Sequence, residues 1–288
     1  MLTKKTAYHL DRPALISFSG GRTSGFMLHE IINAFYGELP SDVIPVFANT
    51  GMEHEKTYRF VEEVSRCWTP ITVVERTKGG GFQVVDIKDA NRAGKPFEDL
   101  IEDKQYLPNP VARICTLDLK VKPMQKFARE RMGWKEYTSA IGIRADEERR
   151  VAKMRAPASR ERDAFEDRTM PLAEEGVCIE DVSNFWATQR KRDDGFDLDF
   201  EPGKNLFGNC VGCFLKGRRK LDEIARAEPS ALEWWARMEE KKRGVASPAA
   251  AFFRTDRPSY RQILLQAQAQ PLLFDAGDDD TLPCDCHS

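Results

Sequence analysis

A glycine-rich stretch near the N-terminus has the residue types of a phosphate-binding loop. The segment Ser-Phe-Ser-Gly-Gly-Arg-Thr-Ser, residues 17–24, follows a short apolar run and precedes an apolar pattern with helical spacing. A strand that turns through glycines into a helix brings backbone N–H groups and the positive end of the helix dipole to one point, which favours an anion. Ser19, Thr23 and Ser24 add hydroxyl donors. No Gly-Lys-Ser/Thr follows as in the eight-residue P-loop, and the alternative is a plain Gly-Gly turn.

Three cysteines have the chemistry of a metal or redox centre. Cys210 and Cys213 form a Cys-x-x-Cys pair in a basic, glycine-containing stretch, and Cys115 lies upstream in a second basic stretch. Nearby cations lower the pKa of a thiol, and thiolates bind both iron–sulfur clusters and zinc. By itself the pair is compatible with an iron–sulfur ligand pair, half of a zinc site, a dithiol redox pair or chance.

The composition of the chain indicates the partners and the cellular compartment in which this chemistry would occur. The 288 residues carry a formal net charge of −2, so binding to nucleic acid would require a local basic face. No apolar run is long enough to span a membrane, and the N-terminus lacks the apolar core of a signal peptide, which predicts a cytoplasmic protein without a membrane partner. Because that compartment is reducing, the seven cysteines are expected to be thiols rather than structural disulfides.

The elements that must position these residues alternate between strands and helices. Strands are expected at 15–19, 43–48, 71–74, 84–85 and 137–143, and helices at 26–35 and 55–67. This alternation predicts an α/β fold with a doubly wound, mainly parallel sheet and a helical C-terminal part. Ligands of such sheets bind beyond the carboxyl ends of the strands. Residues 17–24 and 49–53 both fall at such ends.

Three parts are expected along the chain. They are a phosphate-binding α/β domain (1–170), a helical part that carries the Cys-x-x-Cys pair (171–274), and a flexible acidic tail (275–288). Within them, residues 144–168 are dense in Arg, Asp and Glu, which predicts a surface loop or lid. Helices are expected at 180–189 and 221–242, with Trp234 and Trp235 as packing residues, and Cys67 is expected to be a small core residue.

The glycine-rich stretch resembles the Ser-Gly-Gly-x-x-Ser loop of the ATP-pyrophosphatase (PP-loop, adenine nucleotide alpha-hydrolase) superfamily, which includes the phosphoadenosine phosphosulfate (PAPS) reductases. Residues 46–51 are similar to a family strand that ends in Asp-Thr-Gly, with Asn in place of Asp, and residues 55–61 to its Glu-Thr-Tyr-x-Phe helix. Residues 142–150 resemble a Gly-x-Arg-x-x-Glu-Ser-x-x-Arg loop, with Glu148 in place of Ser. The resemblance spans roughly residues 14–220.

The resemblance implies a site for an adenine nucleotide, either ATP with Mg²⁺ or PAPS. The residues that would hold it are Ser17, Ser19, Gly20, Gly21, Arg22, Thr23, Ser24, Asn49, Thr50, Gly51, Gly142, Arg144 and Arg150. Guanidinium groups bind tetrahedral oxyanions bidentately, so Arg144 with Arg149 or Arg150 would clamp phosphate or sulfate. The alternative for this charged run is a solvated loop. Gly20 and Gly21 are both expected to require positive φ.

The cysteines resemble those of the iron–sulfur members of the PAPS reductase family, the adenylylsulfate reductases. These carry Cys-Cys, then Arg-Lys and Pro-Leu, with a Cys-x-x-Cys further on; Cys115, Lys120 and Pro123 fall in that register. Thr116 stands in place of the second cysteine and Leu119 in place of Arg. The resemblance implies a [4Fe–4S] cluster on Cys115, Cys210 and Cys213. Either the fourth position is open, as in the three-cysteine thiolation enzymes of tRNA and DNA, or Cys178, Cys284 or Cys286 fills it.

Two reactions agree with this resemblance, and the complete Ser-Gly-Gly favours the first. In the first, ATP adenylylates a substrate oxygen and sulfur carried on the cluster displaces AMP, with Cys213, Arg144 and Lys120 as catalytic residues. This first reaction requires a sulfur donor and either a nucleic-acid or a small-molecule acceptor. In the second, a sulfonucleotide reductase releases sulfite, using a thiol reductant protein and a mobile tail cysteine, a motif to which residues 284–288 are only faintly similar.

A third interpretation belongs to another class of protein. The basic stretches 120–126 and 216–220 could follow a phosphate backbone. The chain would then be a zinc-stabilised nucleic-acid-binding module with a degenerate nucleotide fold.

Overall fold

Six strands form one sheet, with β1 near its centre. The structure, a computed structural model, describes residues 6–156, 165–192, 195–198, 206–244 and 247–269. The strand order is β4-β3-β2-β1-β5-β6, and the paired neighbours are parallel except β3 and β4, which are antiparallel. The strands are β1 (Ala14–Ser17), β2 (Val43–Asn49), β3 (Thr72–Arg76), β4 (Phe82–Val85), β5 (Tyr137–Ile141) and β6 (Glu166–Thr169). The predicted α/β class and mainly parallel sheet are confirmed.

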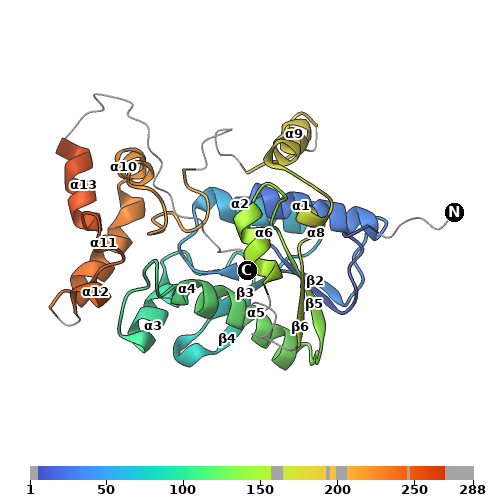
Figure 1. The fold of residues 1–288 in the computed structure, drawn as a ribbon, viewed down its shortest axis with the longest axis horizontal. Helices are drawn as coiled ribbons and strands as arrows, with labels where there is room; N and C mark the ends of the chain where they lie inside the picture. Colours follow the sequence, from blue (N-terminus) through green and yellow to red (C-terminus); the bar gives the residue numbers. More distant parts are fainter. Residues whose placement is uncertain (1–5, 157–164, 193–194, 199–205, 245–246, 270–288) are drawn as a thin grey trace.

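Helices cover both faces of the sheet (Figure 1). On one face, α1 (Arg22–Ala34) and α2 (Glu55–Cys67) bury apolar residues spaced three or four apart, such as Met27 and Ile31, against the strands. The helix α9 (Ile179–Gln189) packs on α1. A continuous helical run covers the other face; it comprises α4 (Ile114–Thr116), η2 (Leu117–Val121), α5 (Lys122–Lys126) and η3 (Phe127–Arg131). The short elements are η1 (Lys78–Gly80), α6 (Glu148–Arg155) and α8 (Pro171–Glu174).

The C-terminal helices form a second apolar cluster at one side of the sheet (Figure 1). They are α10 (Arg218–Ala227), α11 (Ser230–Lys242), α12 (Pro248–Ala251) and α13 (Tyr260–Ala269), and α3 (Lys95–Lys104) joins them. Trp234 and Trp235 are both buried in this cluster, which confirms their predicted packing role. The single helix expected at 221–242 is two helices, because Pro229 has no backbone N–H to continue α10 and caps the start of α11 instead.

Two expectations from the sequence are wrong. Residues 144–168 contain the helix α6 and most of the strand β6, which pairs in parallel with β5, so in its described part the stretch is not a plain loop. The charged residues of this stretch show no apolar periodicity, so the sequence does not reveal these elements. Backbone pairing with β5 at the edge of the sheet makes residues 166–169 a strand. Cys67 is exposed rather than buried, because it is the last residue of α2, beyond the buried Tyr58, Val61 and Val64.

Several earlier predictions fall on parts that the structure leaves undescribed. The tail at 275–288, with Cys284 and Cys286, lies outside the described residues, as does 157–164. The boundary at 170/171 stays a prediction. Across the described part of the chain, none of the helices has the length and apolar character needed to cross a membrane.

Candidate nucleotide site and cysteine cavity

The loop between β1 and α1 turns at Gly20. Its φ is +72°, and a Cβ atom placed there would lie 2.7 Å from Thr57 Cγ2, so both the conformation and the close approach of α2 require glycine. Gly21 is different. Its φ of −109° is ordinary extended backbone, and an added Cβ would meet only Ser19 Oγ, at 3.5 Å. The expectation of positive φ is therefore confirmed at Gly20 and wrong at Gly21.

The hydroxyl of Ser24 ties this loop together. Ser24 Oγ accepts a hydrogen bond from the Ser19 backbone N–H (3.1 Å), lies 2.9 Å from Ser19 Oγ and donates to the Gly21 carbonyl (3.0 Å). The first turn of α1 contains no acidic residue. The loop is thus held at the positive end of a 13-residue helix, an arrangement that suits an anion.

The segment after β5 lies beside the same loop. A Cβ atom on Gly142 would be 3.5 Å from Ser24 Cα, and Arg144 Nη1 donates to Thr23 Oγ1 (3.2 Å). Because β1 and β5 are neighbours and the chain order reverses between them, this is the switch point where doubly wound sheets bind ligands. Arg144 also pairs with Asp146 (2.8 Å), and Arg150 Nη1 donates to Glu147 Oε1 (2.5 Å).

The side chain of Arg22 forms hydrogen bonds with residues 197 and 198. Its guanidinium donates to both carboxylate oxygens of Asp197 (2.8 Å each) and to the Leu198 carbonyl (2.7 Å). The Arg22 carbonyl accepts a bond from Trp186 Nε1 (2.9 Å). These bonds fasten residues 195–198 and α9 to the start of α1. The Arg22 backbone remains part of the helix terminus.

Asn49, Thr50 and Gly51 shape the loop after β2. The buried Asn49 amide donates to Glu75 Oε1 (2.6 Å) and its oxygen accepts from the Gly51 N–H (3.0 Å). Gly51 has a φ of +77°. Thr50 Oγ1 donates to Glu53 Oε1 (2.7 Å) and lies 3.4 Å from Cys210 Sγ. The loop after β2 thus contacts Cys210 of the Cys-x-x-Cys pair directly.

Cys115, Cys210 and Cys213 line one small cavity. Its volume is about 10 Å³, and the other lining residues are Thr50, Phe97, Thr116, Leu119, Lys120, Phe214 and Trp235. We call it the cysteine cavity. Burial raises the pKa of Cys115 to about 12, with the charge of Cys213 adding to the rise, and Lys120 opposes it. Burial likewise raises the pKa of Cys210.

A buried thiol with a raised pKa is neutral until a bound cation replaces its proton, which is how metal binding is coupled to such sites. The donor set, three cysteines around one cavity, suits a group bound through thiolates. No three His, Cys, Asp or Glu side chains of the described residues converge on a point that could hold a single metal ion. Cys178 lies at the start of α9, with its Sγ against the Gly176 carbonyl (3.6 Å), and is not a cavity residue.

The Cys-x-x-Cys turn is docked on the loop after β2. The Val211 N–H donates to the Met52 carbonyl (2.9 Å), and Glu53 and Cys210 form an antiparallel bridge. Lys216 is buried, and its Nζ donates to the carbonyls of Leu206 (2.7 Å) and Val211 (2.9 Å). Burial lowers the pKa of Lys216 to about 8. The burial of Lys216 is not predictable from its place in a basic stretch of the sequence; the apolar Phe214-Leu215 before it is the one local signal.

Lys120 lies between the two halves of the site. It lines the cysteine cavity and also a second small cavity with Ser17, Phe18, Ser19, Val46, Ala48 and Met124. Within the described parts of the chain, its amino group forms neither an ion pair nor a hydrogen bond. A cation placed between a phosphate loop and a sulfur-lined cavity can stabilise negative charge in either.

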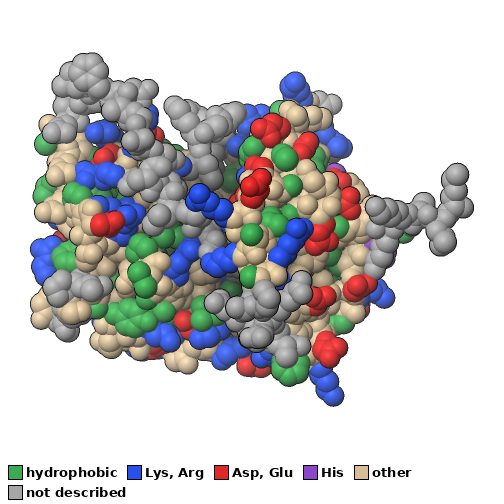
Figure 2. Space-filling model, in the orientation of Figure 1, with side chains coloured by type: hydrophobic (Ala, Val, Ile, Leu, Met, Phe, Trp, Pro, Cys, Tyr) green, Lys and Arg blue, Asp and Glu red, His purple; other side chains and the backbone are tan. Residues whose placement is uncertain are grey.

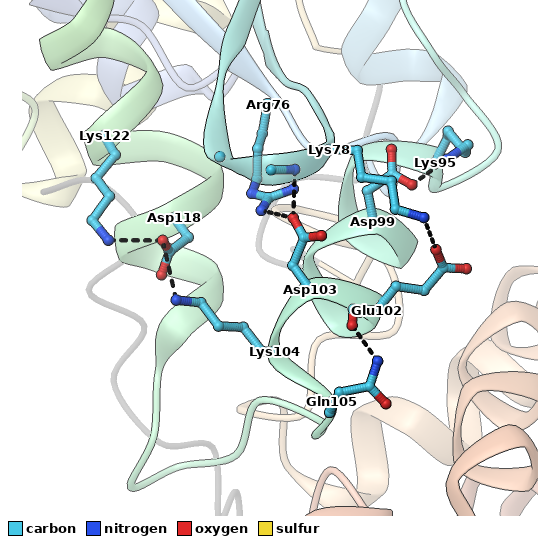
Figure 3. Close-up of polar contacts among 12 residues, drawn as sticks. Arg76, Lys78, Lys95, Asp99, Glu102, Asp103, Lys104, Gln105, Asp118 and Lys122 are labelled. Carbon is cyan, nitrogen blue, oxygen red and sulfur yellow. Dashed lines mark hydrogen bonds and ion pairs between the residues drawn. The ribbon is translucent and has the colours of Figure 1, made fainter.

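Salt bridges hold the Cys115 segment in place. Asp118 accepts from Lys122 Nζ (2.8 Å) and lies 3.9 Å from Lys104 Nζ, as Figure 3 shows. Lys126 Nζ donates to the Gly80 carbonyl (2.9 Å). Arg76 pairs with Asp103 on α3 (Figure 3). The Lys104–Asp118 contact joins the helical run to α3, the Lys126 bond joins it to η1, and the Arg76–Asp103 pair joins α3 to β3.

Comparison with known proteins identifies the family of the α/β part of the chain. The phosphoadenosine phosphosulfate reductase domain model matches residues 13–174. An uncharacterized nin region protein of Escherichia phage lambda (ORF290) is 33% identical over 224 residues, 74% of this chain and 70% of that protein. An uncharacterized protein of Methanocaldococcus jannaschii is 29% identical over 141 residues, 49% of this chain and a quarter (25%) of that protein. The chain therefore belongs to the phosphoadenosine phosphosulfate reductase domain family of the PP-loop adenine nucleotide alpha-hydrolase superfamily.

Proposed function

We propose that this protein is an ATP-dependent sulfur-transfer enzyme that adenylylates an acceptor oxygen and then replaces AMP with sulfur held at the cysteine cavity. The observation that carries the proposal is the position of Lys120, which lines both the cavity beside Ser17 and Ser19 and the cysteine cavity. Two chemistries that must act in succession on one substrate require adjacent sites, and the Lys120 side chain connects them here.

The nucleotide side supplies binding and charge stabilisation. The loop at residues 19–24 and the N-terminal end of α1 would hold the pyrophosphate of ATP, with Arg144 beside Thr23. In the first step the acceptor oxygen attacks the α-phosphorus and pyrophosphate leaves with Mg²⁺. Catalysis by these groups consists of positioning and of stabilising charge that develops on phosphate oxygens.

The sulfur side is built from Cys115, Cys210 and Cys213. A [4Fe–4S] cluster held by these thiolates would supply an iron position for a sulfide-level sulfur that a donor delivers. Cys115, Cys210 and Cys213 would hold the group that presents this sulfur. In the second step the sulfur would replace AMP on the acceptor carbon, and AMP would leave with the electron pair of the C–O bond. We assign the catalytic roles to Cys213, Arg144 and Lys120. Thr50 Oγ1, 3.4 Å from Cys210 Sγ, positions that ligand.

The surface is compatible with a polyanionic acceptor. Figure 2 shows Lys and Arg side chains across the middle of one face, between the C-terminal helices and the helices beside the sheet. Such a local basic face attracts nucleic acid even when the net charge of the chain is −2. A nucleic-acid acceptor is therefore our first choice, and a small-molecule acceptor the second.

A sulfonucleotide reductase is the alternative, supported by the family match over residues 13–174. The intact Ser19-Gly20-Gly21 loop favours ATP. Anaerobic protein should be incubated with ATP and Mg²⁺ plus acceptor, and separately with PAPS and a thiol reductant. We expect AMP and pyrophosphate from ATP and no sulfite from PAPS. Sulfite release with ATP left intact would reject the sulfur-transfer proposal in favour of the reductase.

We expect Lys120→Gln to lower turnover by about 100-fold, the order measured when one transition-state donor is removed. The nucleotide should still bind, because the Gly20 loop is unchanged. Lys122→Gln is the matched control: it lies two residues away, but its amino group pairs with Asp118 (2.8 Å) and it is expected to retain most activity. Single-turnover rates with ATP distinguish them. Equal single-turnover rates in Lys120→Gln and wild type would contradict the catalytic role of Lys120.

A further inference from the structure

We propose that the indole N–H of Trp235 is a hydrogen-bond donor to the sulfur-containing group that Cys210 and Cys213 hold, and that Gly212 is present to admit it. This inference rests on the proposed cysteine-bound cluster and adds a residue from α11, outside the matched family domain at 13–174. Trp235 would tune and position that group without touching the substrate.

Trp235 faces the Cys-x-x-Cys turn at very short range. It is 1% exposed and lines the cysteine cavity together with Cys115, Cys210 and Cys213. A Cβ atom on Gly212 would lie 2.2 Å from Trp235 Nε1. Gly212 has no positive φ, so glycine is required here for space and not for conformation. The indole nitrogen therefore lies directly against the turn that joins the two cysteines.

The Trp235 N–H has no acceptor in the described part of the protein. Its Nε1 is buried and without a hydrogen-bond partner there. Buried donors are rarely left in that state, because desolvation without a partner is unfavourable. An acceptor supplied by a group bound in the cavity would satisfy it. Thiolate and sulfide sulfur are such acceptors: the three cysteines would supply the thiolates, and the bound cluster would supply the sulfides.

The ring is fixed in this orientation by its neighbours. Trp235 stacks on Tyr260 (5.6 Å between centroids, 26°), meets Phe97 edge-on (5.5 Å, 88°) and lies 4.9 Å from Phe253. The Tyr260 hydroxyl in turn donates to the Gly212 carbonyl (2.5 Å). The indole cannot turn to another partner without disrupting this aromatic cluster. The indole nitrogen is thus held against Gly212, in a ring that lines the cavity.

A hydrogen bond to cluster sulfur has a measurable consequence. Reduction adds negative charge to a cluster, and N–H donors stabilise the more negative state, so they raise the reduction potential. Loss of the Trp235 donor should make the midpoint potential more negative while the cysteine ligands keep the iron.

The test compares Trp235→Phe with Trp234→Phe in the full chain, after anaerobic purification. Trp234 is the adjacent residue, and its Nε1 is also buried without a partner among the described residues. It lies against Gly94, 2.6 Å from that residue's added Cβ, and is not a cavity residue. Iron content and the midpoint potential from a redox titration are measured for each protein. We expect all three to bind equal iron, and only Trp235→Phe to have a more negative potential.

The possible results distinguish the donor role of Trp235 from the presence of the cluster itself. Equal potentials in Trp235→Phe and wild type overturn the donor role and leave the cluster intact. Wild-type protein without iron overturns the cluster and this inference together. If Trp235→Phe loses iron, Gly212→Ala serves instead, because its Cβ displaces the indole while both cysteines remain. A more negative potential in Gly212→Ala supports the inference, and an unchanged potential rejects it.

Discussion

Replacing Gly20 with valine is expected to reduce nucleotide affinity by more than about 100-fold, which corresponds to roughly 3 kcal/mol of binding free energy. Gly20 has a φ of +72°, which a β-branched residue adopts only with strain on the order of 1–3 kcal/mol. Its Cβ would also lie 2.7 Å from Thr57 Cγ2, 3.2 Å from Val61 Cγ2 and 3.3 Å from Phe47. To relieve these contacts the loop must move away from α2, and its N–H groups then no longer converge.

Gly21→Ala is the matched control for this prediction. The neighbouring glycine has a φ of −109°, and its Cβ would meet only Ser19 Oγ, at 3.5 Å, so we expect an affinity within a few-fold of wild type. Calorimetric titration with ATP and with PAPS measures both variants, and circular dichroism checks that each is folded. Similar affinity in a folded Gly20→Val protein would show that residues 19–24 do not hold the phosphates.

The sheet could be predicted from sequence because its strands are buried on both faces. Strands such as β2, Val43–Asn49, are near-continuous apolar runs, and the helices between them have a clear 3.6-residue period. The strand β6, Glu-Asp-Arg-Thr, has neither signal. It is a strand because β5 offers it a free edge, which local sequence does not reveal.

The residues of the site could be named from sequence, but their neighbours could not. The glycine-rich loop and the three cysteines are recognisable by type and spacing. That Thr50 lies 3.4 Å from Cys210, or that Lys120 lines two cavities, depends on contacts between distant segments. Lys216 illustrates the same limit: its charge suggests a solvated surface, yet two backbone carbonyls satisfy it in the interior. Trp235 has no sequence signal beyond being apolar.

Each of Cys115→Ala, Cys210→Ala and Cys213→Ala is expected to lose most of the bound iron. The three thiols line one cavity, and Cys210 and Cys213 are buried, so no solvent ligand readily replaces a missing thiolate. Among the described residues three cysteines line the cavity, so removal of one leaves two, whereas iron–sulfur clusters are usually held by four thiolates. The alanine side chains are smaller than cysteine, so the fold should tolerate them at a modest cost in stability.

Cys67→Ala and Cys178→Ala are the controls for this second prediction. Cys67 is exposed at the end of α2, and Cys178 lies at the start of α9; neither lines the cysteine cavity. Both variants should reconstitute to the iron content and visible absorption of wild type under anaerobic conditions. Full iron loading of Cys210→Ala would reject the assigned ligand set. Loss of iron in Cys178→Ala would instead identify a fourth ligand, and would require α9 to move toward the cavity when iron binds.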